Sequence, residues 1–297
     1  MTWLIYALLS AVFFGLRGIL YQWSSKHGYE RNLMLFGVFA SGAIVSLIGL
    51  LLFQQQWSMA ALVGIMMGIF SFAANASMFK GFSVGKASLI AILTAMPPVL
   101  VALLAYIVWK ETLSTMQLAA FAVILIGIIL IRYSNDLSLK NLQGAQWGLL
   151  AMLFFSLNDM TGKLSTMLDA ALFPTIFCMF ATGAACFGIS WRIDQDRRKR
   201  RALLDPAMSE KELQGMKSAP RTFGWGLVVG LTNVFGMILI ISAFRDGLTG
   251  LVSAVASLNV LLILLYTRIF LREKFSPMEL TGMAAAVSGV LLLRLFQ

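Results

Sequence analysis

Charged residues are scarce in this sequence of 297 residues: Asp, Glu, Lys and Arg make up 12% of it, against 59% apolar residues. A soluble domain has about a quarter of its residues charged, because water must solvate its surface. The mean hydropathy of +0.85 therefore excludes an ordinary soluble protein. In hydrocarbon only helices and closed barrels satisfy their backbone hydrogen bonds, and the apolar runs here have helix-spanning length. The sequence predicts an all-α integral membrane protein.

Residues that commonly act in catalysis or bind metals are also scarce. There is one histidine, His27, and the two cysteines lack a CxxC spacing. We find no Walker loop, HExxH pair or nucleophile elbow, so we expect no enzyme, no catalytic residue, no cofactor and no metal. The net charge of +10 raises the question of nucleic acid, but the basic residues lie between the apolar runs. Membrane topology and anionic lipid explain them better, so we expect no nucleic-acid partner.

Ten apolar runs are long enough to cross a bilayer as helices. They cover roughly residues 3–23, 33–53, 59–79, 87–108, 115–132, 147–166, 170–191, 222–243, 249–270 and 277–295. Most connections are short, so neighbouring helices should be antiparallel. The exception is the basic segment 192–221, for which we predict a loop.

The basic residues between the runs predict the orientation. Eighteen lysines and arginines lie on the side of the connections 1–2, 3–4, 5–6, 7–8 and 9–10, and four lie on the opposite side with both termini. Cytoplasmic loops carry the excess of positive charge. This predicts a multi-pass protein of the cytoplasmic (inner) membrane, with the 192–221 loop in the cytoplasm and both termini outside.

An internal repeat organises the chain. Shifted by 162 residues, the segment 64–133 aligns without a gap with 226–295. Identical pairs include Gly64 and Gly226, Gly68 and Gly230, Phe82 and Phe244, Gly85 and Gly247, Glu111 and Glu273, and Gly127 and Gly289. The first helix of each half matches at an offset of 141 residues instead.

The halves are residues 3–132 and 147–295, joined by a loop at 133–146. Five helices in each half are an odd number, so the second copy should be inverted relative to the first. Inverted repeats around a central cavity are the geometry of alternating access. The alternative is an inert duplicated membrane scaffold.

The repeated segment contains a basic residue, a glutamate and, three positions later, a serine: Lys110, Glu111 and Ser114, then Arg272, Glu273 and Ser276. We interpret the two glutamates as helix-end caps that form local salt bridges with the basic residues before them. With the spacing of glycines around it, the repeated segment resembles the drug/metabolite transporter superfamily, specifically its ten-helix members with two EamA domains. The resemblance covers about 4–132 and 147–295. The usual aromatic-Gly pair on the first helix appears only as Phe14-Gly15.

The resemblance implies that helices 1, 3, 4, 6, 8 and 9 line a central cavity and that helices 5 and 10 pack at the periphery. It also implies a carrier of amino acids, other metabolites or drugs. Family members often keep both termini in the cytoplasm, which is the opposite of the loop charge count, so the orientation stays open between the two.

Two charges fall within predicted spans: Arg17 in the first and Asp159 in the sixth. Each costs ~2.5–3.5 kcal/mol at the bilayer centre on insertion scales, so both should face the protein interior. One interpretation is a substrate site in which Arg17 binds a carboxylate or phosphate and Asp159 an amine. A second is a structural ion pair between the two. In a third, Asp159 binds and releases a proton during transport.

Uncharged polar residues near mid-span complete the predicted cavity. With Arg17 and Asp159, the candidate substrate-binding residues are Phe14, Asn75, Asn158, Asn233, Ser253, Ser257 and Asn259. Such side chains either bond neighbouring helices or face a ligand, and both interpretations stay open. Pro97 and Pro98 remove two amide donors and should kink the fourth helix as a hinge.

Together these features favour a secondary transporter that moves a small amino-acid-like or amphipathic metabolite by alternating access, in the direction of export. The partners expected are that solute and the lipid bilayer, with coupling to protons or to exchange, and the chain as a monomer or homodimer. The alternatives are a multidrug or organic-cation efflux carrier and a lipid-carrier flippase of the same fold.

Overall fold

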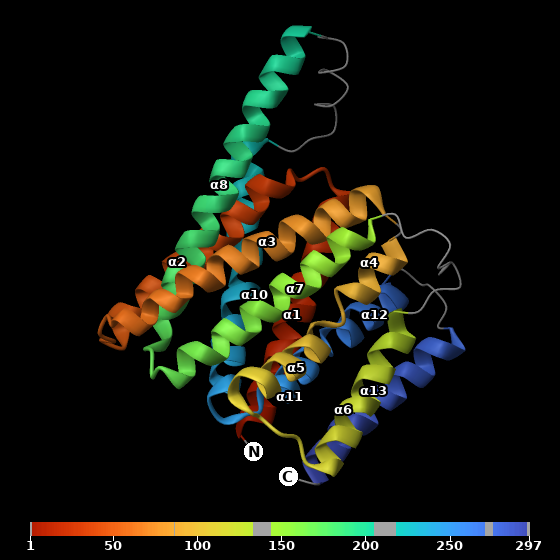
Figure 1. Cartoon of the computed structure of the whole chain (residues 1–297). Helices are drawn as coiled ribbons and strands as arrows, with labels where there is room; N and C mark the ends of the chain where they lie inside the picture. Colours follow the sequence, from red (N-terminus) through yellow and green to blue (C-terminus); the bar gives the residue numbers. More distant parts are fainter. Residues whose placement is uncertain (1, 86, 133–143, 205–217, 271–275, 296–297) are drawn as a thin grey trace.

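The computed structural model describes residues 2–85, 87–132, 144–204, 218–270 and 276–295, and across them every regular element is a helix (Figure 1). The first half contains α1 (Thr2–Lys26), α2 (Arg31–Leu52), the short 3₁₀ helix η1 (Met59–Leu62), α3 (Val63–Val84), α4 (Ala87–Leu93), α5 (Pro97–Trp109) and α6 (Thr115–Arg132). The second half contains α7 (Ala145–Met167), α8 (Leu172–Leu204), α10 (Ala219–Asp246), α11 (Thr249–Ala256), α12 (Asn259–Phe270) and α13 (Pro277–Leu295). The predicted all-helical class is confirmed.

Nine helical stretches of the described residues are long and apolar enough to cross a membrane. They correspond to nine of the ten predicted spans. The sixth, α7, is not among them, since Asn158, Asp159 and Lys163 interrupt its apolar sequence. Its 23 residues would still extend about 34 Å at 1.5 Å per residue, which is enough to cross the hydrocarbon.

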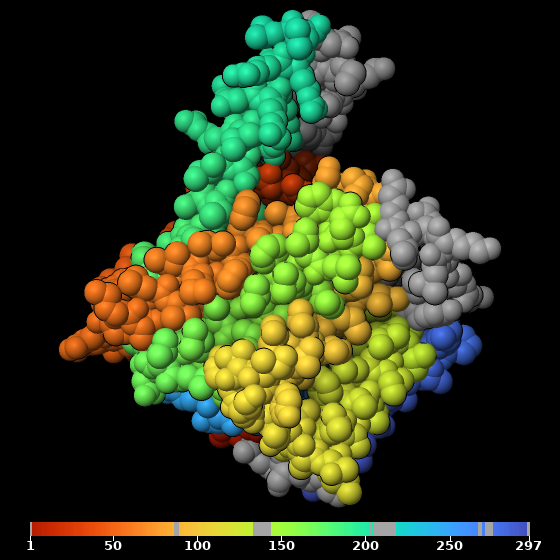
Figure 2. Space-filling model, viewed as in Figure 1, coloured from red at the N-terminus to blue at the C-terminus, as the bar shows by residue number. Residues whose placement is uncertain are grey.

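The predicted loop at 192–221 is wrong for its first part, because α8 continues to Leu204 and projects beyond the other helices (Figure 2). Polar contacts to the start of α2 hold this extension. The Asn32 amide donates to Asp194 Oδ2 at 2.6 Å, and Arg198 Nη1 lies 3.1 Å from Glu30 Oε1. Residues 205–217 and most of the 133–146 connection lie outside the described residues.

The fourth and ninth predicted spans are each broken into two helices. The first break lies between Leu93 and Pro97, and the second lies at Ser257 and Leu258. Pro97 has no amide hydrogen to continue the ladder of α4, which gives a physical reason for the first break. No proline causes the second break, yet Asn259, which starts α12, is the residue that aligns with Pro97 at the offset of 162.

The main contacts between helices come in equivalent sets. Helix α3 of the first half packs along α7 and α8 of the second half. The equivalent helix α10 of the second half packs along α1 and α2 of the first. Likewise α12 contacts α1, and α5 contacts α7. Two further pairs, α2 with α8 and α6 with α13, each join equivalent helices from the two halves. The beginning of α1 and the end of α13 lie at the same end of the molecule (Figure 1).

Repeated glycines make these contacts close. A methyl group on Gly64 of α3 would overlap the backbone oxygen of Thr175 in α8, and one on Gly226 of α10 would overlap that of Met34 in α2. Gly64 and Gly226 differ by 162, and Met34 and Thr175 by 141, which are the offsets found in the sequence. Small residues let helix backbones approach in a membrane, where no hydrophobic effect drives helices together.

We therefore expect Gly64→Leu and Gly226→Leu to destabilise the protein by at least about 1–3 kcal/mol, the usual cost of overpacking. The matched control is Gly224→Leu, because a Cβ at Gly224 meets nothing within 4 Å. Thermal unfolding of the purified variants measures the effect. Equal midpoints for all three variants would contradict the close packing.

Candidate functional site

A cavity of about 260 Å³ lies where the two halves meet, and residues from both halves line it. Most of its wall comes from α1, α3, α5, α7, α10, α11 and α12, with Thr94 at the first helix break and Ser257 at the second. These elements belong to the first, third, fourth, sixth, eighth and ninth predicted spans. Arg132 of α6 and Met179 of α8 add to the wall.

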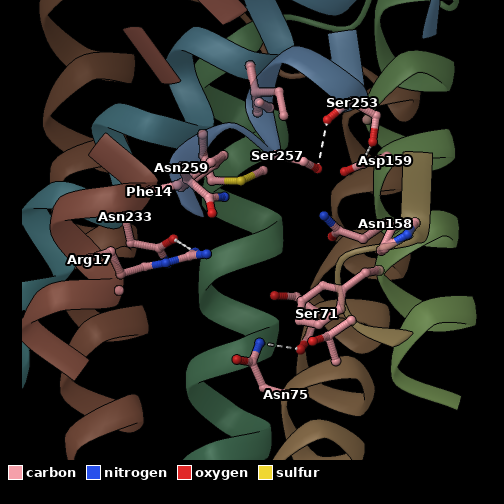
Figure 3. A pocket seen from close by; sticks show the side chains of 18 of the residues that line it. Phe14, Arg17, Ser71, Asn75, Asn158, Asp159, Asn233, Ser253, Ser257 and Asn259 are labelled. Carbon is pink, nitrogen blue, oxygen red and sulfur yellow. Dashed lines mark hydrogen bonds between the residues drawn. The ribbon is translucent and has the colours of Figure 1, made fainter. Parts of the chain in front are cut away.

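All nine residues that the sequence suggested for substrate binding line this one cavity (Figure 3). They are Phe14, Arg17, Asn75, Asn158, Asp159, Asn233, Ser253, Ser257 and Asn259. Pro97 also lines it, at the break that begins α5. Pro98 is buried in the same turn but is not part of the wall. These side chains therefore surround one cavity, and their role in substrate binding stays a prediction.

Arg17 lies on one wall, among aromatic rings and a neutral amide (Figure 3). Its Nη1 donates a hydrogen bond to Asn233 Oδ1. The guanidinium carbon is 4.6 Å from the centre of the Phe14 ring and 5.8 Å from that of Tyr21. These contacts orient the guanidinium but supply no negative charge, so an anionic solute would find an uncompensated cation here.

Asp159 lies on the facing wall, where Ser253 Oγ donates to its Oδ2 at 2.6 Å (Figure 3). Among the described residues, the ion pairs formed are those of Lys163 with Glu111 and Arg198 with Glu30. The suggested ion pair of Arg17 with Asp159 is therefore not formed in this conformation. The two charges are held apart by partners on their own walls.

The amide side chains of the cavity are not all satisfied. Asn75 donates to the Ser71 backbone oxygen at 2.8 Å, as a residue that supports its own helix would. The buried Oδ1 of Asn158 has no hydrogen-bond partner. A buried acceptor without a partner costs free energy unless a ligand or water supplies a donor. Asn158 is thus the amide best placed to meet a solute.

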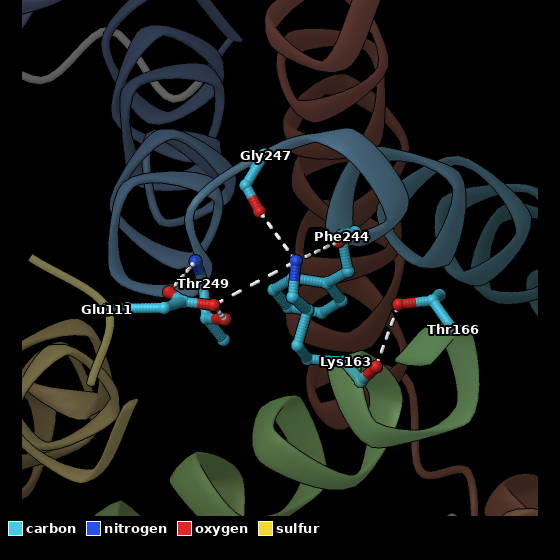
Figure 4. Close-up of polar contacts among 6 residues, drawn as sticks. All are labelled: Glu111, Lys163, Thr166, Phe244, Gly247 and Thr249. Carbon is cyan, nitrogen blue, oxygen red and sulfur yellow. Dashed lines mark hydrogen bonds and ion pairs between the residues drawn. The ribbon is translucent and has the colours of Figure 1, made fainter. Parts of the chain in front are cut away.

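Polar contacts close one end of the cavity, beside Phe244 (Figure 4). Lys163 Nζ donates to the backbone oxygens of Phe244 at 2.7 Å and Gly247 at 3.0 Å, and lies 3.8 Å from Glu111 Oε1. Glu111 also accepts from the Thr249 backbone amide and hydroxyl, both at 2.8 Å. These contacts join α7 and the connection after α5 to the turn between α10 and α11.

The sequence had suggested Glu111 and Glu273 as helix-end caps with local salt bridges to Lys110 and Arg272. Glu111 does cap a helix, but the helix is α11 of the other half and its ion pair is with Lys163. The Glu111 carboxylate thus contacts Lys163 and Thr249 of the second half. Glu273 and Arg272 lie outside the described residues.

Exposure indicates which end of the cavity is open. At the end near Lys163, Phe244 and Ser253 are 1% and 2% exposed. At the other end, Tyr21, Met78 and Arg132 are partly exposed. Tyr21 lies near the end of α1, Met78 near the end of α3, and Arg132 ends α6. This difference in exposure favours an opening at the end where α6 finishes.

Sequence reasoning missed Arg132, Lys163 and Tyr21 as residues of this region. In the count of basic residues that predicts the orientation, Arg132 belongs to the side with eighteen and Lys163 to the side with four. A signal for Arg132 was present, because the residue that aligns with it at the offset of 162 is Arg294, also an arginine. No local pattern marks Lys163, since its partners lie far away in the sequence.

Comparison with known proteins adds two findings. The model of the family described as "EamA-like transporter family" matches residues 1–133 and 142–295, which is nearly the whole chain. No curated protein matches significantly. A solved structure titled "Crystal structure of protein" superposes with a TM-score of 0.73 at 14% identity, covering 98% of this chain and 99% of that one. At this identity the likeness concerns the fold alone.

We expect Glu111→Ala to destabilise this end of the cavity by about 1–3 kcal/mol, because it leaves the Thr249 amide without its acceptor and the Lys163 ammonium without its counter-charge. Glu111→Gln is the matched control, since its amide oxygen can still accept from Thr249, and it should lose less. Thermal unfolding of both purified variants measures this. A Glu111→Ala midpoint equal to that of the unchanged protein would contradict the role of these contacts.

Proposed function

This chain belongs to the EamA-like transporter family, whose members move small solutes across membranes, and from that premise we propose that it exports a small amino-acid-like or amphipathic metabolite by alternating access. The proposal places it as a multi-pass protein of the cytoplasmic membrane. The open end of the cavity, near Arg132, then faces the cytoplasm, as the excess of basic residues on that side favours.

The observation that carries the proposal is a polar cavity in which opposite charges stand on facing walls without pairing. Arg17 is bonded to Asn233 and Asp159 to Ser253. A solute that carries a carboxylate and an amine could bridge the two walls, with the carboxylate on Arg17 and the amine on Asp159. The unpartnered Oδ1 of Asn158 offers a further acceptor to the amine.

The size and charge of the cavity favour a metabolite over a drug. Drug-sized ligands occupy pockets of roughly 300–1,000 Å³, whereas this cavity has about 260 Å³. Arg17 and Arg132 both line it, with Asp159 as the carboxylate among the described lining residues. An organic cation would meet an excess of positive charge, which makes the organic-cation alternative less favourable.

Alternating access requires that one face can open while the other closes. We take α7 as the tenth crossing, because an even number of crossings returns the chain to the side on which it began, and the ends of α1 and α13 lie together (Figure 1). The matched glycine contacts support two copies related by a two-fold axis in the membrane plane. The broken spans α4–α5 and α11–α12 then provide the hinges.

We expect Arg17→Ala and Asp159→Asn each to reduce solute flux by tenfold or more while the protein still inserts. Uptake and exchange in proteoliposomes of purified protein measure this, with the solute found by a thermal-shift screen of metabolites. Arg245→Ala, an exposed arginine that is not part of the cavity wall, is the control and should keep full flux.

The same variants separate the roles of Asp159. If Asp159 binds the amine, Asp159→Asn abolishes both proton-driven uptake and solute exchange. If it carries the coupling proton instead, exchange survives and only proton-driven uptake is lost. Full flux in both the Arg17 and the Asp159 variants would remove these residues from the mechanism.

A further inference from the structure

Arg132, the last residue of α6, is a cation that the transport site described above leaves without a role. Its side chain lines the open end of the cavity, and its buried Nε has no hydrogen-bond partner. Neither ion pair of the described residues involves it. An arginine that is only a topology marker would extend into water or toward lipid headgroups. This one is retained in the cavity wall, and no described residue supplies its counter-charge.

The repeat supplies a second arginine at the equivalent place. Arg294, in the last turn of α13, aligns with Arg132 at the offset of 162. The two helices pack on each other through equivalent residues: a Cβ on Gly127 would meet Gly282 and Ala286, and one on Gly289 would meet Ala120 and Ile124. Yet Arg294 is exposed and is not part of the cavity wall, whereas Arg132 is.

The two arginines differ because the two ends of the cavity differ. The end near Arg132 is the less buried one, and α13 finishes at the opposite end of the molecule (Figure 1), where α6 begins after the residue Glu111 that pairs with Lys163. In an inverted repeat, the opposite-facing state is reached when each half adopts the conformation of the other. Arg294 would then occupy the mouth, and Arg132 would be the exposed member of the pair.

We propose that Arg132 and Arg294 are a pair of mouth residues that alternately recognise an acid group, carboxylate or phosphate, of the solute on the two sides of the membrane. The inference rests on the transport function proposed above and narrows the substrate to solutes with a net negative charge. An amino-acid-like solute would carry one acid group for Arg17 and a second for the mouth arginine. Guanidinium groups suit this task, because they bind carboxylate and phosphate in bidentate geometry.

The test measures the charge preference of each mouth directly and needs no transport. A cysteine replaces Asn75, which lines the cavity, in a protein with Cys178→Ala and Cys186→Ala. Purified protein in phosphatidylcholine nanodiscs is labelled with the anionic sulfonatoethyl and the cationic trimethylammonioethyl methanethiosulfonates. Because this lipid has no net charge, no anionic headgroup competes for the arginine.

We expect Arg132→Gln to lower the ratio of anionic to cationic labelling rates by roughly tenfold or more, since a charged cleft raises the local concentration of counter-ions. Arg132→Lys keeps the charge and should keep most of the ratio. Arg294→Gln is the matched control at this mouth and should leave the ratio unchanged. An unchanged ratio in Arg132→Gln would overturn the proposal, and it would leave the transport function standing.

The second mouth is tested with a cysteine at Met237, which aligns with Asn75 and also lines the cavity. The reagents do not cross membranes, so sealed right-side-out and inside-out vesicles present the two faces separately. From the side of the membrane on which α13 ends, Arg294→Gln should lower the ratio of anionic to cationic labelling rates. Arg132→Gln should leave that ratio unchanged. If Arg132→Gln alone acts from both faces, the alternation between the two arginines is overturned.

Discussion

The cost of placing a charged or polar group in hydrocarbon is the constraint on which this structure depends. The helices satisfy the hydrogen bonds of the backbone, but Arg17, Asp159 and Arg132 carry charges that lipid cannot solvate. Each must face the protein interior, and each does so at the cavity where the two halves meet. Arg17 is bonded to a neutral amide, Asp159 to a hydroxyl, and Arg132 Nε to no described group, so the charges are not neutralised by one another.

Duplication gives the two halves of the chain equivalent contacts between their helices. The glycines that let α3 approach α8 recur where α10 approaches α2, and the contacted residues recur as well. These two interfaces are equivalent in position, although Thr175 stands in one where Met34 stands in the other. The differences between the copies then matter most. The position aligned with Lys163 at the offset of 141 is Gln22, so the ammonium that supports the closed end has no charged counterpart at the open one.

Much of the fold could be predicted because hydropathy and the internal repeat can be found in the sequence without knowing which residues are in contact. Nine of the ten spans qualify as membrane helices, and all nine suggested site residues line one cavity. The errors have physical causes. The sequence predicts a loop at the end of α8 because charged residues end the apolar run there, yet Glu30 and Asn32 bind this segment as a helix. It also predicts that Glu111 pairs with its neighbour Lys110, whereas the carboxylate contacts Lys163 and Thr249 of the other half.

The sequence alone determined that the chain lies in a membrane, that it is a duplicated set of helices, and which polar side chains must avoid lipid. These conclusions follow from composition, length and periodicity, which need no knowledge of long-range contacts. Only the tertiary structure decided that Arg17 bonds to Asn233 and Asp159 to Ser253, and that Arg132 rather than Arg294 enters the cavity. Those choices depend on how helices distant in sequence rotate and pack against one another.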